Sequence, residues 1–516
     1  MSEPNNIPGI TRPEEEKKLA EVITIAEKNL DKAKHSVQIL TGEMKDMLEI
    51  DVSKNKETMV LWNNTQAGLQ DAKEELLRCQ KARKKPYFGR IDFIDDKTKT
   101  EEAYYIGRVG IKDTVTDRIV IDWRAPVATV YYEESLGKCK YNVRNVGEYS
   151  IDLTRKRTYE IADDRLLDFY DTEVVANDDL LTRYLGKSKK AVLGEIIATI
   201  QKEQNLIIRK SPRNNILVQG GAGSGKTTVA MHRISYILYN YENEFLPKDF
   251  YIVGSNRILL NYITSVLPDL DVYGISQMTM EQLFIRLLYE DWDAQKYTIH
   301  SLEKGEETAC IKGSYQWFHD LEKFCAQYEW KQIPHEEIRT ENTKKLLLSK
   351  EEIETYINEN PHISVQNKIL SLNERVMARL ENEITCRNIS YTPEEKHEMK
   401  KFYRFYFGGK IWKGSIFDMY EKFLLAQQAE GKRVQLPGTD FDVYDLAALA
   451  YLYKRIKETE LIREASHVVI DEAQDFGMMA YASLYYCMRG CTYTIMGDVS
   501  QNIHFGYGLN DWEELK

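Results

Sequence analysis

Hydrophobic positions in the first 85 residues follow the spacing of two packed helices. Apolar side chains recur every three or four residues over two stretches, as they do along a coiled-coil seam. The first series is Leu19, Ile23, Ala26, Leu30, Ala33, Val37, Leu40, Met44 and Met47; the second is Trp62, Thr65, Leu69, Ala72, Leu76 and Cys79. A polar segment rich in turn formers separates them at 49–57. We predict an antiparallel coiled-coil arm over residues 1–85, either as a structural hairpin or as a probe for a partner.

The hydrophobic period changes after residue 86. Segments 103–110, 117–123 and 127–132 are rich in β-branched and aromatic residues, and Gly, Asp, Lys and Thr separate them. This composition is typical of strands joined by turns, so residues 86–177 are predicted to form a small β-rich module. Within it, the string Asp122-Trp123-Arg124-Ala125-Pro126 indicates a strand end with a buried Trp and a paired Arg.

Short apolar runs dominate the rest of the chain and alternate with helical patterns. The runs at 215–219, 250–253, 272–275, 467–470 and 493–496 are predicted to be strands of one parallel sheet, because strands buried on both faces are apolar throughout. A stretch rich in Glu, Lys and Tyr interrupts them. We therefore expect an α/β domain in two parts, 178–279 and 441–516, with a helical insertion at 280–440.

Composition sets limits on partners and location. A chain of 516 residues is expected to form about three domains. The net charge of −11 means that nucleic acid must be bound through local basic patches. The seven cysteines are scattered without metal-ligand spacing, and no apolar run approaches the ~18 residues of a membrane span. We expect a cytoplasmic protein with no membrane partner.

The run at 215–219 leads directly into a complete phosphate-binding motif. Its residues are Gly220, Gly221, Ala222, Gly223, Ser224, Gly225, Lys226 and Thr227, followed by Thr228 at the start of a helical pattern. Glycines let backbone N–H groups turn toward an anion at a helix N-terminus. Lys226 is expected to reach the β- and γ-phosphates, and the Thr227 hydroxyl to coordinate Mg²⁺. The motif predicts binding of ATP or GTP.

Two later strands end in residues that complete this chemistry. The run at 467–470 ends in Asp471 and Glu472, at the sheet edge where ligands of α/β folds bind. Asp471 is expected to hold Mg²⁺ and Glu472 to polarise the attacking water, whereas an ordinary acidic loop is the alternative. The run at 493–496 leads to Gln501, whose amide can sense the γ-phosphate.

These strings, in this order, resemble the superfamily 1A, UvrD-like helicases. The resemblance implies a RecA-like P-loop NTPase domain in which Lys226, Glu472 and Gln501 are catalytic. It also implies that Gln204 contacts adenine, which favours ATP, and that Asn256 and Thr279 touch single-stranded DNA. Phe505 and Tyr507 stand where family members stack a base, although such rings are more often packed in a core.

The N-terminal half resembles a narrower group, the HelD-like proteins, through the strings at 87–92, 105–108 and 122–126. That resemblance implies a protein that binds bacterial RNA polymerase core, inserts its arm into the secondary channel and uses ATP to release the polymerase from nucleic acid. The acidic residues near the turn of the arm would then approach the polymerase centre: Glu43, Asp46, Glu49, Asp51 and Glu57.

Motifs IV, V and VI of this family have no match in the sequence. They belong to a second RecA-like domain, whose arginines stabilise the transferring phosphoryl group. We therefore expect a truncated motor that binds Mg-ATP and hydrolyses it weakly. The alternatives are a UvrD-like DNA helicase acting in DNA repair and a catalytically weak module that binds RNA polymerase.

Overall fold

The computed structural model describes residues 11–48, 56–113, 118–133, 135–162, 164–171, 197, 200–221, 223–255, 257–302, 307–385, 391–502, 506 and 508–515. It divides into two compact units. The first contains residues 1–211, 228–246 and 265–273, and the second contains residues 212–227, 247–264 and 274–516. No helix of the described residues is long and apolar enough to cross a membrane.

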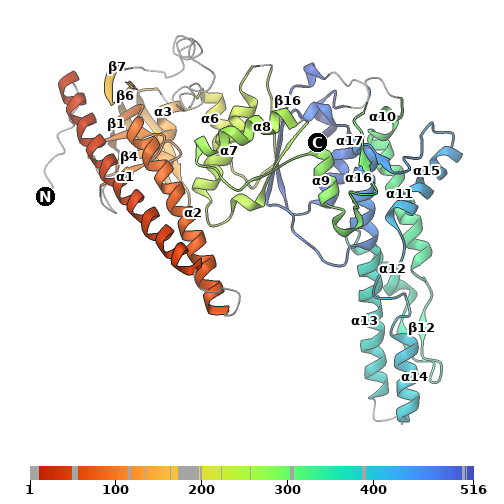
Figure 1. Cartoon of the computed structure of the whole chain (residues 1–516). Coiled ribbons are helices and arrows are strands. Elements are labelled where there is room, and N and C mark those ends of the chain that lie inside the picture. The colour runs from red at the N-terminus through yellow and green to blue at the C-terminus, as the bar shows by residue number, and fades with distance from the viewer. Residues whose placement is uncertain are drawn as a thin grey trace. The chain divides into compact units, whose positions relative to one another are not determined.

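Two long helices begin the first unit: α1 (Arg12–Leu48) and α2 (Lys56–Lys84). They run antiparallel and side by side, red and orange in Figure 1, since Arg83 pairs with Glu27 while Gly68 faces Leu40. The predicted hairpin of helices is therefore present, and the segment 49–55 with Glu49 and Asp51 lies outside the described residues.

The root of the arm is fixed to the β module by a buried carboxylate. Glu15 is fully buried and accepts hydrogen bonds from Arg90 (3.2 Å), Tyr105 (3.0 Å), Arg157 (2.8 Å) and Tyr159 (2.7 Å). Burying an unpaired carboxylate would cost several kcal/mol, so the two guanidinium groups are what permit it. The helical spacing did not predict this contact.

Among the described residues, seven strands form the sheet of the first unit. They are β1 (Gly89–Asp95), β2 (Glu101–Gly107), β3 (Ile111–Lys112), β4 (Arg118–Asp122), β5 (Gly137–Val143), β6 (Gly147–Ala162) and β7 (Arg165–Asp171). Their order is β3-β4-β2-β1-β6-β5, with β7 also on β6, and among these described strands only the β2–β4 pair is parallel. The β-rich character predicted for this region is confirmed.

One predicted strand of this module is wrong. Residues 127–132 form a 3₁₀ turn at Pro126–Ala128 and the helix α3 (Thr129–Glu133). Pro126 occupies the first turn, where its fixed φ suits a helix and its missing N–H costs nothing. Burial of Tyr131 and Tyr132 then outweighs their preference for strands.

The last part of the first unit surrounds the string at 122–126. It contains α6 (Lys202–Arg209) and most of α7 (Lys226–Asn240). Trp123 is buried with its ring edge-on to His232, and Arg124 is paired with Asp122 at 2.6 Å, both as predicted. Arg124 also donates to Ser235 at 3.1 Å, so the β module packs against the body of α7.

A parallel five-stranded sheet is the core of the second unit. It contains β8 (Ile216–Gln219), β9 (Phe250–Gly254), β10 (Ser276–Thr279), β15 (His467–Ile470) and β16 (Thr492–Gly497), in the order β10-β9-β15-β16-β8. The parallel α/β fold predicted from the apolar runs is confirmed. The strand predicted at 272–275 is wrong: Gly274 has a φ of +74°, which breaks the extended backbone, and β10 begins at Ser276.

The insertion is largely helical, as predicted. After α8 (Arg257–Val266) and α9 (Met280–Arg286) come α10 (Glu307–Lys312), α11 (Tyr315–Gln332), α12 (Lys350–Glu359), α13 (Val365–Ile384), α14 (Pro393–Tyr403) and α15 (Ile416–Ala429). Two small sheets pair β11 (Thr298–Ile299) with β14 (Asp440–Phe441) and β12 (Ile338–Arg339) with β13 (Leu346–Leu348). In Figure 1, α13 and α14 lie side by side along the far part of the insertion.

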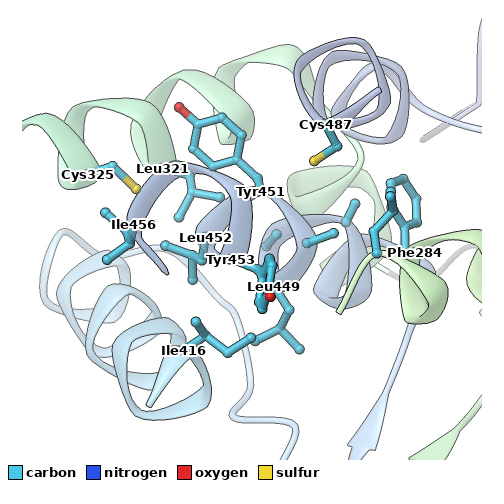
Figure 2. Packing of buried hydrophobic residues seen from close by; sticks show 14 of the residues in the cluster. Phe284, Leu321, Cys325, Ile416, Leu449, Tyr451, Leu452, Tyr453, Ile456 and Cys487 are labelled. Carbon is cyan, nitrogen blue, oxygen red and sulfur yellow. The ribbon is translucent and has the colours of Figure 1, made fainter. Parts of the chain in front are cut away.

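A completely buried helix joins the insertion to the sheet. Every residue of α16 (Val443–Leu452) is buried, and the chain continues as a π-helical turn over Tyr453–Lys457. Figure 2 shows Leu449, Tyr451 and Leu452 of this helix among residues from four other helices: Phe284 of α9, Leu321 and Cys325 of α11, Ile416 of α15 and Cys487 of α17 (Met478–Cys487). The sheet and the insertion therefore share one core. The limits predicted for the separate domains stay predictions.

Candidate active site

The phosphate-binding motif forms the turn between β8 and α7. Gly223 and Gly225 have φ values of +74° and +82°, a region that side chains other than Gly rarely adopt. The Ser224 N–H donates to the Gly221 carbonyl at 3.2 Å, which tightens the loop. Ala222 lies outside the described residues. The loop ends at the N-terminus of a 15-residue helix, where backbone N–H groups and the helix dipole favour an anion.

Lys226 and Thr227 are the first two residues of α7. The Lys226 ammonium folds back over the loop and donates to the carbonyl oxygens of Gly220 (2.7 Å) and Gly221 (3.3 Å). The Thr227 hydroxyl donates to Oδ2 of Asp471 at 2.5 Å. The helix therefore brings a cation and a hydroxyl to the carboxyl end of the sheet.

Asp471 and Glu472 follow β15 directly. Asp471 is buried; burial raises the pKa of its carboxyl, and the hydrogen bond from Thr227 opposes that rise. Its N–H donates to the Val253 carbonyl at 3.0 Å, which ties the loop to β9. Glu472 has left-handed backbone angles (φ 51°, ψ 45°), which are uncommon for a residue with a long side chain.

The Thr227 hydroxyl and the Asp471 carboxylate fit a magnesium ion. Mg²⁺ prefers oxygen ligands and is usually held by one or two protein side chains together with water and phosphate oxygens. These two oxygens are already adjacent, and the acidic Glu472 lies beside them. The role of Thr227 and Asp471 as magnesium ligands stays a prediction.

Gln474 joins the end of β15 to the end of β16, a role that the sequence did not reveal. Its Nε2 donates to Oε2 of Glu472 at 2.8 Å, while its Oε1 accepts from the Asp498 N–H at 2.9 Å. The adjacent Gly497 leaves room for it, because a Cβ there would lie 2.4 Å from Oε1 of Gln474. Gln474 belongs to the sequence string 471–475 that indicated the site. Its contacts could not be predicted, because they depend on β15 and β16 being neighbours in the sheet.

Asp498 directly follows β16 and accepts hydrogen bonds from side chains around the end of that strand. Its carboxylate accepts from Ser500, from Gln219 Nε2 at 2.6 Å and from Gln501. Hydrogen bonds from Ser500, Gln501 and Gln219 hold the pKa of Asp498 well below its usual range. Gln501 is therefore held through Asp498 beside the last residue of β8, which precedes the phosphate-binding loop.

The predicted nucleic-acid residues are only partly described. Thr279 ends β10 and caps α9, accepting from the Gln282 N–H at 3.4 Å. Asn256, Phe505 and Tyr507 lie outside the described residues. Their contacts with a DNA strand stay predictions.

Gln204 and Thr228 belong to the first unit. Gln204 is the third residue of α6, and its Oε1 accepts from the Gln201 N–H at 3.2 Å, closing the first turn of that helix. Thr228 lies in the first turn of α7, where its carbonyl is 2.7 Å from Nδ1 of His232. Contact of Gln204 with adenine stays a prediction.

Two protein families match the chain. Residues 12–184 match the N-terminal domain of DNA helicase IV, HelD, and residues 200–508 match the N-terminal domain of the UvrD/REP helicases. The second match covers more than half of the 516 residues and contains every residue of the nucleotide site described above. No curated protein matches the chain.

Proposed function

Because the chain belongs to the HelD-like branch of the UvrD/REP helicases, we propose that it is an ATP-hydrolysing motor that releases bacterial RNA polymerase from nucleic acid. Proteins of the UvrD-like family use ATP and Mg²⁺ in general. The proposed substrate would place the protein in the cytoplasm.

The hydrogen bond between Thr227 and Asp471 is the observation that carries the ATP site. It brings together the helix that follows the phosphate-binding loop and the strand end that supplies the acidic pair, over a sequence separation of 244 residues. A magnesium ion on these two oxygens would stabilise negative charge on the β- and γ-phosphates. Lys226 would contact the same phosphates from the loop.

Hydrolysis needs a base for the attacking water, and Glu472 is placed for that task. Its carboxylate would accept a proton from the water as the bond between the γ-phosphorus and the ADP oxygen breaks. Gln474 would fix the direction of this carboxylate through its amide N–H. Because the same amide accepts from Asp498, a movement of Gln501 toward the γ-phosphate would be transmitted to the base.

The polymerase as substrate is supported by the N-terminal half. The HelD match covers α1, α2 and the β module, parts that strand translocation alone does not require. The β module also contacts the body of α7, the helix that begins with Lys226 and Thr227. Nucleotide binding at the first turn of α7 could thereby bias the position of the arm root.

Turnover by these 516 residues is expected to be slow. The sequence has no match to motifs IV to VI, and arginines of that kind accelerate phosphoryl transfer roughly 10³- to 10⁵-fold. Binding of Mg-ATP does not need them. Fast, strand-stimulated hydrolysis by the purified chain would favour the DNA-helicase alternative.

A pull-down on immobilised bacterial RNA polymerase core tests the choice of partner. The full chain is compared with a variant in which residues 38–70 are replaced by a short glycine-rich turn, which removes the outer arm and keeps the buried root at Glu15, Leu19 and Val22. We expect the full chain and Lys226→Ala to bind and the shortened arm to lose binding. Absence of binding by the full chain, or equal binding by the shortened variant, would overturn the proposal.

A further inference from the structure

The side chain of Gln219 joins three parts of the second unit. Gln219 is the last residue of β8 and immediately precedes the phosphate-binding loop. Its Nε2 donates to Oδ1 of Asp498 at 2.6 Å. Its Oε1 accepts from the indole Nε1 of Trp512 at 2.6 Å and from the Val499 N–H at 3.4 Å. Both ends of one planar amide are engaged, so a rotation that follows Asp498 also moves the acceptor of the Trp512 N–H.

The ends of β8 and β16 are also joined through the backbone. Gln219 lies opposite Gly497 in the parallel pair, and the Gly220 N–H donates to the Gly497 carbonyl at 3.2 Å. The first residue of the phosphate-binding loop is thus fixed to the strand end that Asp498 follows. Because the backbone is held in this way, we expect a change at this point to involve the side chains.

The Asp498 carboxylate accepts from four donors among the described residues. The Ser500 N–H, the Ser500 hydroxyl and Gln219 Nε2 donate to Oδ1, whereas Gln501 Nε2 donates to Oδ2. Hydrogen bonds to a charged acceptor are stronger than those between neutral groups, so the carboxylate should keep its donors as far as geometry allows. If the Gln501 amide turns toward a γ-phosphate, Oδ2 loses this donor, and we expect the carboxylate and Gln219 to readjust together.

The chain just before Trp512 is anchored at the same strand ends. The Leu509 N–H donates to the Gln474 carbonyl at 3.1 Å, and Asn502 Nδ2 donates to the Leu509 carbonyl at 3.0 Å. Leu509 is fully buried, whereas Trp512 is only half-buried. The indole ring of Trp512 therefore has room to respond to its hydrogen-bond acceptor while the backbone before it stays in place.

We propose that Gln219 is a positioning residue for hydrolysis. Through Asp498 it sets where the Gln501 amide rests, and through its own carbonyl it ties Trp512 to that position. This inference rests on the proposed ATP site, because the group that would draw Gln501 away is the γ-phosphate. ATP and ADP would then leave Trp512 in different surroundings, since ADP lacks the phosphate that competes for Gln501. A hydrogen bond that only braces the fold would be the same with both nucleotides.

Fluorine NMR of the full chain labelled with 5-fluorotryptophan tests this proposal. The seven tryptophans act as separate probes, and the resonance that is lost in Trp512→Phe is assigned to Trp512. We expect this resonance to shift when Mg²⁺ and the non-hydrolysable analogue AMP-PNP are added, and to stay in place with Mg-ADP. Trp412 is the internal control: its indole also donates a hydrogen bond, to Tyr328 at 2.9 Å in the insertion, and its resonance should not move.

Two substitutions break the proposed connection at different points. Gln219→Met removes both of its hydrogen bonds at similar side-chain length, and Gln501→Met removes the amide that senses the γ-phosphate. In both variants the Trp512 resonance should stop responding to AMP-PNP. Gln219→Met should also lower the single-turnover rate of ATP hydrolysis about 10-fold and change the Kd for Mg-ATP by less than about threefold. Gln427→Met on α15 is the matched control, since this amide also donates and accepts, and it should keep the response.

The outcomes separate this inference from the ATP site itself. Displacement of a fluorescent ATP analogue by AMP-PNP shows whether the unaltered chain binds the nucleotide, and absence of binding would overturn the ATP site together with this inference. Binding without a shift at Trp512, an equal shift with ADP, or an unchanged shift in Gln219→Met would overturn the inference alone. Equal losses of rate and of ATP affinity in Gln219→Met would show that Gln219 braces the loop and does not position Gln501.

Discussion

At the scale of single residues, the side chain of Gln474 connects the ends of β15 and β16. It donates to Glu472 and accepts from the Asp498 N–H, so one amide links the proposed base to the end of β16. A group that only orients a base should affect the rate of hydrolysis far more than the binding of substrate.

We therefore predict that Gln474→Met lowers kcat for ATP by about 10- to 100-fold and changes the Kd for Mg-ATP by less than about threefold. Single-turnover hydrolysis and binding of a fluorescent ATP analogue measure the two quantities. Gln427→Met, a buried glutamine on α15 away from the site, is the control and should leave kcat unchanged. A loss of ATP affinity equal to the loss of kcat would show that Gln474 holds the loop and does not orient the base.

A second residue-scale prediction concerns Asp445, which is buried in α16. Lys312 and Tyr420 donate to its carboxylate at 2.7 Å and 2.5 Å, yet burial, followed by repulsion from Asp442, raises its pKa to about 6. The folded chain therefore holds this proton more tightly than the unfolded chain does. Its contribution to the free energy of unfolding is complete below about pH 4 and is lost as pH rises through 6.

Asp445→Asn should remove that part of the pH dependence. Relative to the variant, the parent should lose about 2–3 kcal/mol of unfolding free energy between pH 4 and pH 7, since one pKa unit corresponds to about 1.4 kcal/mol. Urea unfolding at a series of pH values measures the difference. Parallel pH profiles for the two proteins would show that Asp445 stays ionised over this range.

At the scale of elements, the attachment of the arm depends on Glu15 of α1. Two arginines and two tyrosines donate to this one carboxylate, whereas the neighbouring Glu16 has a half-exposed side chain that pairs only with Arg12 among the described residues. Removing one partner of a buried charge network costs far more than removing an exposed pair.

We expect Glu15→Gln to cost about 3–5 kcal/mol in the stability of the first unit, and Glu16→Gln less than about 1 kcal/mol. Thermal unfolding gives the stability, and amide hydrogen exchange over residues 12–30 reports whether α1 separates from the β module. Equal effects of the two substitutions would contradict the proposed anchor.

Elements were predictable where local sequence determines them. The strands β9, β15 and β16 are short apolar runs with nothing inside them that opposes extended backbone, and α7 follows its glycine-rich loop directly. The errors occurred where one residue changes the backbone: Pro126 starts a helix within a run of strand formers, and Gly274 ends the extended path before Ser276. Glu15 and Gln474 were missed because their partners are distant in sequence or lie on another strand.

At the scale of the whole molecule, the first unit is assembled from three separate stretches of sequence. Asp271 shows how: it accepts from Lys81 at the arm root and from Arg124 in the β module, over separations of 190 and 147 residues. Hydrophobic spacing does not encode such contacts. The packing of the β module against α7 could therefore be found only in the folded chain.

That packing gives the proposed motor a physical route from nucleotide to arm. Lys226 and Thr227 begin α7, and Ser235 further along the same helix accepts from Arg124. If this connection couples the nucleotide site to the arm, binding or hydrolysis of ATP must change how the arm interacts with a bound polymerase. Docking of the arm and release of the polymerase are then separable steps.

The most direct test measures release of RNA polymerase core from a fluorescent nucleic-acid scaffold by the full chain. The account predicts slow release with Mg-ATP, none with Glu472→Gln or Lys226→Ala, and normal docking of both variants to the polymerase. Release at the same rate without nucleotide, or by Glu472→Gln, would contradict the claim that the chain is an ATP-driven motor and would favour a binding module.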